Sequence, residues 1–143
     1  MPFSSVQAKV ERAAAAVIAS AASSTGLAVF TGLDTDAITL PCAICEATSA
    51  SPPPGLQFTG IQQVELVVSV RSNKSDSTPA QHELRCATVF DALTTDTAAA
   101  DLSAAISDFK AFMVEFGQLS QSVEDDSHVN SASFRVTCCP ASV

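Results

Sequence analysis

The stretch LQFTGIQQVELVVSVR, Leu56–Arg71, decides the fold. Apolar side chains occupy every second position of its second half, at Val64, Leu66, Val68 and Val70. The residues between them are polar, apart from Val67. In an extended chain, alternate side chains point to opposite faces, so this pattern is typical of a strand with one buried face. We therefore predict a long β-strand over residues 56–71.

Shorter β-like pieces precede this strand. They are Leu27–Leu33 and Ala37–Ala47, separated by the turn-forming residues Asp34–Asp36. The next segment, Thr48–Gly55, contains three consecutive prolines, which cannot donate hydrogen bonds to a sheet. We expect an extended loop there.

Two more strands are predicted at the C-terminal end, over residues 112–117 and 128–139. The second alternates clearly, with an inward-facing set at Ala132, Phe134, Val136 and Cys138. The polar stretch Gln118–Ser127 between the two strands is expected to be a loop.

Helical spacing of apolar residues predicts three helices, over residues 4–23, 79–93 and 97–109. The first has an apolar stripe at Val6, Val10, Ala13, Val17 and Ala21. Lys9, Glu11 and Arg12 are expected at its sides, and Gly26 can end it in the left-handed conformation. Pro79 suits the first turn of the second helix, and Asp96 can cap the third.

The order of elements predicts the fold class. Strands follow one another without intervening helices, which favours antiparallel pairing. We expect an α+β fold over residues 1–143, a mostly antiparallel sheet with about three helices on one face. A chain of 143 residues suits a single domain, and its 47% of apolar residues excludes disorder as the main state.

The charge balance excludes two classes of partner. Seven Lys and Arg face 15 Asp and Glu, a formal net charge of −8. Scattered cations in an acidic chain do not grip nucleic acid phosphates, and such a chain is repelled by anionic membranes. The alanine-rich stretch Ala13–Ala21 loosely imitates a signal peptide, but Glu11 interrupts its basic flank and it lacks Leu and Phe. We expect neither export nor a membrane span.

Five cysteines, an odd number, indicate reduced thiols packed as small apolar residues in an intracellular or virion-interior setting. Cys42-x-x-Cys45 has the spacing of a redox pair or of half a zinc site, with Cys138-Cys139 as the other half. In a strand, however, residues three apart face opposite sides, and so do adjacent residues. We favour packing for all four and keep a cytosolic binding or thiol-redox domain using Cys42 and Cys45 as an alternative.

The remaining polar groups suggest no enzyme. His82 and Cys86 lie four residues apart on one helix face, but no orienting carboxylate or oxyanion motif accompanies them. His128 is the other histidine. The acidic run Glu124-Asp125-Asp126 lacks the glycine and alternating carboxylates of a calcium loop. We predict no catalytic, metal-binding or cofactor-binding residue, and no cofactor.

The layout resembles the small neck proteins of long-tailed bacteriophages, in particular the tail terminator or tail-completion family. The likeness rests on the first helix, the long strand with its turn Ser72–Ser77, and the helix Pro79–Leu93. It continues through the stretch from Asp101-Leu102 to Ala104-Ala105-Ile106 and the final segment Ser122–Val136.

The resemblance implies a structural virion protein. Such proteins form a ring, usually of six copies, that ends the tail tube and meets the head-side connector or stopper proteins. The implied partners are copies of the chain, the tail tube protein and those neck proteins. The implied location is the tail and neck of a virion assembled in the host cytoplasm. A connector or stopper of the same neck is the nearest alternative.

The acidic run suits that role. Copies that each carry −8 around a channel would let DNA slide through without specific binding. We therefore expect Glu124, Asp125 and Asp126 near the channel or at a contact within the ring.

Overall fold

The computed structural model describes residues 2–23, 25–32, 39–55, 60–106, 108–124 and 126–139. The strands form one five-stranded sheet in the order β1-β2-β3-β5-β4. Their bounds are β1 Ala28–Thr31, β2 Cys42–Ser51, β3 Gln62–Asn73, β4 Lys110–Glu124 and β5 Ser127–Cys139. Only β1 and β2 pair in parallel within this sheet, and the other neighbours are antiparallel. The α+β prediction is confirmed.

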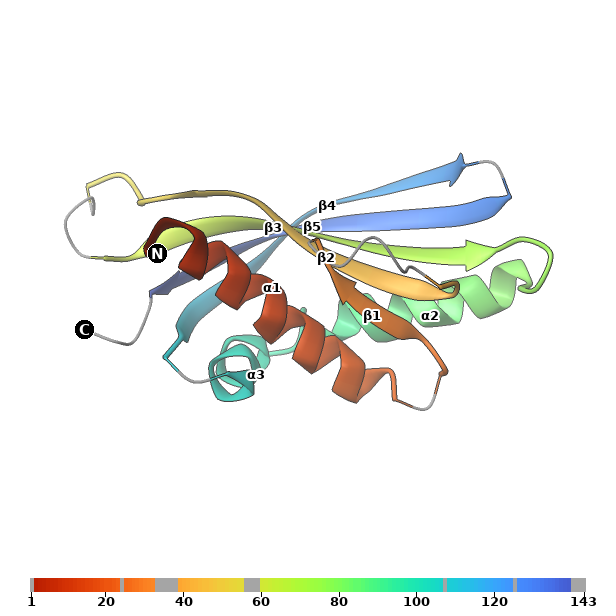
Figure 1. Ribbon diagram of the computed structural model, residues 1–143, viewed down its shortest axis with the longest axis horizontal. Coiled ribbons are helices and arrows are strands. Elements are labelled where there is room, and N and C mark those ends of the chain that lie inside the picture. The colour runs from red at the N-terminus through yellow and green to blue at the C-terminus, as the bar shows by residue number, and fades with distance from the viewer. Residues whose placement is uncertain are drawn as a thin grey trace.

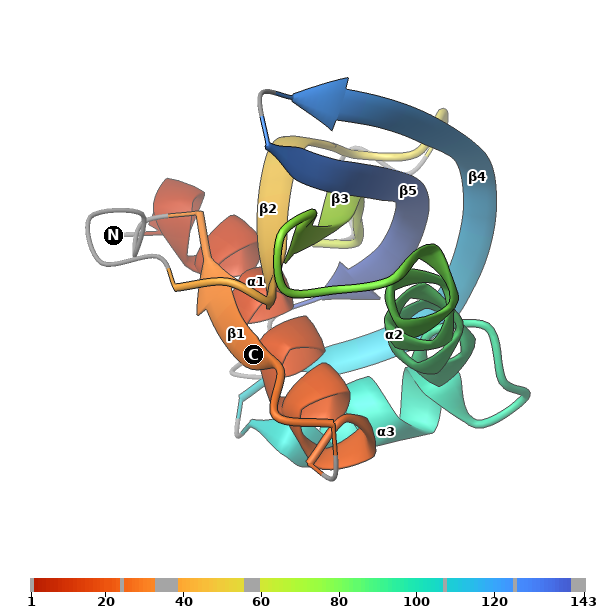
Figure 2. The same cartoon turned by 90° about the vertical axis from the view of Figure 1, so that its right-hand side faces the viewer.

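Three helices, α1 Pro2–Ala21, α2 Pro79–Ala92 and α3 Ala98–Ala105, lie on one side of the twisted sheet (Figure 1). Viewed along the strands, the sheet curls around this side, with α2 near the inner face of β5 and α3 beneath the start of β4 (Figure 2). The other face of the sheet carries no helix of the described chain.

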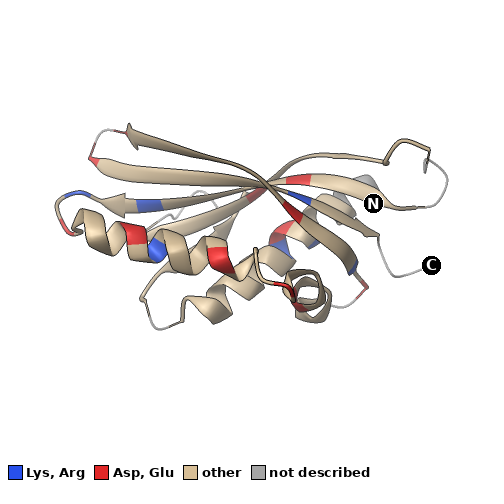
Figure 3. Ribbon diagram, turned by 180° about the vertical axis from the view of Figure 1, so that it is seen from behind, with Lys and Arg blue, Asp and Glu red and all other residues tan. Residues whose placement is uncertain are grey.

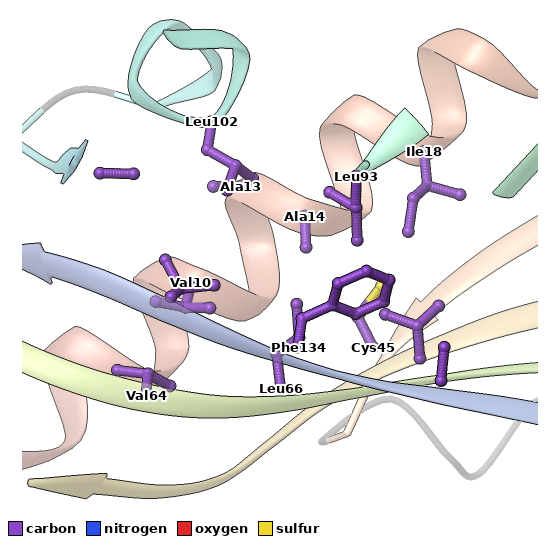
Figure 4. Packing of buried hydrophobic residues seen from close by; sticks show 14 of the residues in the cluster. Val10, Ala13, Ala14, Ile18, Cys45, Val64, Leu66, Leu93, Leu102 and Phe134 are labelled. Atoms are coloured by element: carbon purple, nitrogen blue, oxygen red, sulfur yellow. The ribbon is translucent and has the colours of Figure 1, made fainter. Parts of the chain in front are cut away.

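The core lies between the sheet and the helices. The alternating residues of β3 are fully buried, as are Phe134, Val136 and Cys138 of β5. Leu102 of α3 reaches toward Ala13 of α1 (Figure 4). Leu93, the C-cap of α2, lies beside Ala14 and Ile18 of α1 (Figure 4). A helix can cover a sheet this closely because its core-facing side chains are mostly alanine and valine.

The buried stripe of α1 differs from the predicted one in its second half. Val6, Val10 and Ala13 are buried as expected, but the stripe continues through Ala14, Ile18 and Ala22 instead of Val17 and Ala21. The reason is that Val17 and Ala21 lie on the side of α1 next to α3, where an open groove leaves them partly or fully exposed, whereas Ala14 and Ile18 belong to the core with residues of β2, β3 and β5. Sequence spacing alone does not show which neighbours a helix has.

Glu11 is a second difference, since it is buried and not at the side of the helix. Its Oε2 accepts a hydrogen bond of 2.8 Å from the N–H of Ala47 in β2. That N–H lies beside the register shift between Ala47 and Ser49. The carboxylate therefore joins α1 to the irregular part of β2.

Helix α2 begins as predicted at Thr78-Pro79. Thr78 Oγ1 accepts from the N–H of Gln81, and the Gln81 side chain accepts from the N–H of Thr78, which forms a capping box. Helix α3 is shorter than predicted. Its N-cap is Thr97 and not Asp96, and Phe109 lies beyond its end but is buried.

Two predicted loops are wrong in part. Strand β2 continues through Ser51, so the first residues of Thr48–Gly55 belong to the sheet. The stretch Gln118–Ser127 is mostly strand, because β4 runs to Glu124 and pairs with β5 along its length. Both errors have one cause: backbone pairing with a neighbouring strand overrides a polar composition when the strand has exposed faces. Residues 33–38, which lie within two predicted β pieces and the turn between them, and the start of the predicted strand 56–71 lie outside the described residues.

Candidate interaction surfaces

The edge strand β4 carries an unusual set of exposed apolar side chains. Phe116, Leu119 and Val123 are 50%, 60% and 55% exposed. Their cross-strand partners in β5 are Phe134, Ala132 and His128, which face the helices. Paired residues of antiparallel strands point to the same side, so these three side chains continue the apolar face of the sheet beyond the helices. We call Phe116, Leu119 and Val123 the β4 strip.

A bulge at Gly117 makes this strip possible. Residues three apart face opposite sides of a regular strand, but the register shifts between Phe116 and Leu119 and returns both to one face. A Cβ at position 117 would lie 2.5 Å from Ser133 Oγ, so the close approach requires glycine. Ser133 Oγ also accepts a 3.0 Å hydrogen bond from the N–H of Gln118. The bulge is therefore fixed by a specific contact with β5.

The opposite face of β4 has a second, smaller apolar group, Phe112 and Met113, which are about half exposed. The Lys110 ammonium lies 5.5 Å from the centre of the Phe112 ring, within range of a cation–π contact. A register shift between Ala111 and Met113 lies at the same place. The edge strand thus shows apolar side chains on both faces.

A shallow groove separates α1 from α3. It has a volume of about 540 Å³ and is lined mainly by small side chains, including Ala16, Ser20, Ala21, Ala104 and Ala105. Its charged lining residue is Asp101, whose carboxylate accepts a 3.1 Å hydrogen bond from Thr97 Oγ1. Because alanine and serine do not fill the space between the two helices, the groove can receive larger apolar side chains.

Two residues of the predicted acidic run, Glu124 and Asp126, lie at the tip of the β4–β5 hairpin. Glu124 ends β4, and its carboxylate pairs with Arg71 of β3 at 3.1 Å. The carbonyl of Asp126 accepts a 2.7 Å hydrogen bond from the N–H of Lys74. Asp125 lies outside the described residues. The tip is therefore attached to β3 and the turn that follows it.

His82 and Cys86 do come together, with Nε2 and Sγ 3.6 Å apart, but within a buried polar cluster. Nδ1 of His82 lies 2.8 Å from Ser72 Oγ, and Nε2 lies 2.8 Å from Asn130 Oδ1. Arg85 donates to Ser72 Oγ at 3.0 Å and to Ser77 Oγ at 2.8 Å. The cluster joins α2 to β3 and β5.

The chemistry of this cluster does not favour nucleophilic catalysis. Burial, together with the charge of Glu83, raises the pKa of the Cys86 thiol to about 11. Nucleophilic cysteines need a lowered pKa. Ser72 is fully buried, so no substrate reaches its hydroxyl in this structure. The ring of His128 lies 5.5 Å from that of His82 and extends the cluster toward β4.

The other cysteines are also packed. Cys45 lies in the core, and burial with the nearby Glu11 raises its pKa to about 12. Cys138 is in the same core, with a pKa raised to about 12 by burial and by Cys139. Cys42 is buried but does not belong to that core, consistent with residues three apart facing opposite sides of β2. Burial raises its pKa too, against the opposing charge of Arg71.

Among the described residues, no three His, Cys, Asp or Glu side chains are grouped closely enough to hold a metal ion. No described helix combines the length and apolar character that a membrane crossing requires. Lys and Arg are scattered over helices and strands (Figure 3).

No protein-family model matches the sequence, and no curated protein matches it significantly. Solved structures do match the fold. One is a chain of the virion of a native gene transfer agent particle, with a TM-score of 0.59 and 22% sequence identity. The match covers 94% of this chain and 94% of that chain. The likeness establishes the fold.

The sequence places the acidic run before the last strand and His82 and Cys86 on one helix face, but it did not reveal the β4 strip or the groove. Phe116 was placed in a strand, whereas Leu119 and Val123 were assigned to a loop. Their spacing could have indicated a strand. If one extra residue, a bulge, is allowed near Gly117, Phe116, Leu119 and Val123 fall on one face of an extended chain. The groove has no such signal, because it arises where two helices distant in sequence meet.

Proposed function

We propose that this chain is a structural protein of a virion, and that it forms a ring at the neck which ends the tail tube and joins the tail to the head. The observation that carries the proposal is the fold match, which runs end to end over a chain of a virion. The neck position rests on the resemblance of the sequence to tail terminator proteins.

The surfaces support assembly over catalysis. The sheet ends in a long edge strand with exposed apolar side chains on both faces, a pattern that marks interaction sites. The thiols with raised pKa values, Cys42, Cys45, Cys86 and Cys138, are suited to packing and not to redox chemistry. The partners are copies of the chain, the tail tube and the head-side neck proteins.

We place the hairpin tip with Glu124, Asp125 and Asp126 at the channel. The chain has a net charge of −8, and an acidic rim repels DNA phosphates, so DNA passes without specific binding. A map of the assembled ring with this tip facing outer solvent would exclude that placement.

Electron microscopy of particles produced without this chain tests the function. A terminator ring stops tube growth, so its loss gives tubes of uneven length that are not joined to heads. Loss of a connector or stopper instead gives tubes of normal length and heads that lose their DNA. Particles of normal length, with tails attached, would refute both roles.

A further inference from the structure

We propose that the free edge of β4 binds an extended segment of a different protein, which adds a strand to the sheet. The segment has apolar side chains on the helix side and a Lys or Arg near each end on the opposite side. This inference goes beyond the proposed function, because it states what kind of segment binds and not where in a particle the chain lies.

Strand β4 is the last strand of the sheet, so one of its edges has no neighbouring strand. Helix α3 covers the start of this edge. Ser103 Oγ accepts a 2.9 Å hydrogen bond from the N–H of Ala111 and lies 3.3 Å from the Ala111 carbonyl oxygen. The backbone groups of Ala111 therefore point away from β5, and those of its cross-strand partner, Cys138, point to β3.

This orientation determines which other residues of β4 face the free edge. Strand β5 pairs with β3 without a register shift, so its N–H and C=O groups point to β3 and to β4 at alternate residues. Asp126 is an even number of positions from Cys138, and its carbonyl does accept from Lys74, which follows β3. Even-numbered residues of β5 therefore point to β3, and their partners on β4 point to solvent.

Three residues of β4 thus present backbone N–H and C=O groups at an open edge, the partners of Ala132, Asn130 and His128. They are Leu119, Gln121 and Val123. Residues 117–124 are exposed, and within the described chain no turn, loop or side-chain hydrogen bond reaches these groups. Leu119 and Val123 also belong to the β4 strip, so the same residues offer hydrogen bonds and apolar side chains.

The open edge lacks the devices that usually prevent strand addition. Natural sheets protect their edges with charged side chains, prolines or bulges. Strand β4 contains no proline, and no charged residue lies between Phe116 and Val123. Its bulge at Gly117 precedes the open edge, and pairing with β5 is regular from Leu119 to Glu124. An added strand can therefore form main-chain hydrogen bonds there.

One end of this edge carries excess negative charge on the sheet face opposite the β4 strip. Glu115 lies there, across from Arg135 of β5. Arg135 already pairs with Glu65 of β3 at 2.8 Å. Two carboxylates thus share one guanidinium, which favours a cation on the added strand.

The other end is similar. Glu124 lies on that same face and pairs with Arg71 at 3.1 Å. Asp126 is exposed and has no ion-pair partner among the described residues. The facing turn adds one charge of each sign, at Lys74 and Asp76. This end therefore also holds one carboxylate in excess.

These charges select a different protein over a second copy. Two β4 edges brought together in either direction would set acidic ends against acidic ends, and like charges on paired strands are destabilising. The edge strands of this chain, β1 and β4, contain Lys110 as their single basic residue. A complementary strand that reaches from Glu115 to Glu124 needs about nine residues at about 3.3 Å each.

The probe is a peptide of about nine residues that alternates valine and threonine, with a lysine at each end on the threonine side. Fluorescence anisotropy measures its binding to the full chain. It should bind at least about tenfold more tightly than the same peptide with glutamates in place of the lysines. Equal binding of the two peptides would overturn the proposed charge complementarity.

Hydrogen exchange followed by NMR locates the bound peptide. In the free chain the amides of Ser120 and Ser122 should be protected by β5, whereas those of Leu119, Gln121 and Val123 exchange fast. The lysine peptide should slow exchange at these three amides. Binding without this protection, as when a helix covers the strip, overturns the proposal. So does protection that grows with the concentration of the free chain, which assigns the edge to a second copy.

Two variants test the edge itself. Gln121→Pro removes one outward N–H and no hydrogen bond to β5, so it should keep the wild-type melting temperature and bind the lysine peptide at least about tenfold more weakly. Gln121→Ala keeps the N–H and should bind like wild type. Ser120→Pro should lower the melting temperature, because its N–H points to β5.

Leu119→Lys adds a positive charge to the strip and should also weaken binding of the lysine peptide at least about tenfold. Leu84→Lys, at an exposed leucine of α2, is its matched control and should bind like wild type. Wild-type affinity in both Gln121→Pro and Leu119→Lys overturns the proposal, as does a peptide that does not bind at millimolar concentration. Particles made without this chain test the neck role separately, so either proposal can fail alone.

Discussion

Phe116 and Phe134 meet edge to face across β4 and β5, with ring centroids 5.8 Å apart, yet one is half exposed and the other fully buried. The pair marks the place where the core of the chain ends and its free apolar surface begins. Phe134 fills the space under α1, whereas Phe116 lies beyond the helices.

This difference predicts unequal effects of truncation. Phe134→Ala should lower the free energy of unfolding by about 3–5 kcal/mol, because it leaves a cavity in a packed core. Phe116→Ala should lower it by only about 1 kcal/mol, the value of an edge-to-face contact. Urea denaturation of both variants measures the two values. Equal losses would mean that Phe116 belongs to the core.

The bulge at Gly117 predicts a specific intolerance. Gly117→Ala should destabilise the chain by about 1–3 kcal/mol, because the new Cβ would lie 2.5 Å from Ser133 Oγ and the strands must separate. The cost should shrink in a Ser133→Ala background, where that oxygen is absent. A double-mutant cycle by chemical denaturation measures this coupling, and additive effects would show that the contact is not the cause.

The buried thiol of Cys45 predicts a loss of stability at alkaline pH. Its pKa rises from 9.0 to about 12 on folding, so between these values the folded chain holds a proton that the unfolded chain has lost. The free energy of unfolding should therefore fall as pH rises from 9 to 12.

Cys45→Ala removes the thiol that titrates. The free energy of unfolding of this variant should therefore fall less steeply between pH 9 and 12 than that of the wild-type chain. Val68→Ala is the matched control, because Val68 is the cross-strand partner of Cys45 and its truncation keeps the thiol. Denaturation at a series of pH values compares the slopes. The account fails here if Cys45→Ala follows the wild-type slope.

The polar cluster predicts a structural role for His82. His82→Ala should cost about 1–3 kcal/mol, because it leaves Ser72 and Asn130 without their hydrogen bonds to the ring. Glu83→Ala, at the exposed neighbouring position, should change stability by no more than about 0.5 kcal/mol. Thermal melts of the two variants compare them. A His82→Ala chain as stable as wild type would contradict the assignment.

The fold class and the interior of the sheet could be predicted from the sequence because burial on one face leaves a two-residue period. Val64 to Val70 and Ala132 to Cys138 show it, and every one of these apolar positions is buried. The start of helix α2 could also be predicted from the sequence, because the residues that cap it, Thr78, Pro79 and Gln81, are neighbours in the chain.

The edge of the molecule could not be predicted in the same way. Residues of β4 after Phe116 are exposed on both faces, so burial imposes no period on them, and a bulge shifts what pattern remains. Glu11 looked like a surface residue because its partner, the N–H of Ala47, is 36 positions away. The interaction surfaces likewise depend on contacts between residues that are far apart in the sequence.

A cryo-EM map of the neck of an intact particle tests the central claim most directly, which is that this chain acts by assembling with copies of itself. The account predicts a closed ring of this fold at the end of the tail tube, with Phe116, Leu119 and Val123 covered by a neighbouring protein of the particle. A particle whose neck lacks the chain, or a ring in which these side chains face solvent, would contradict it.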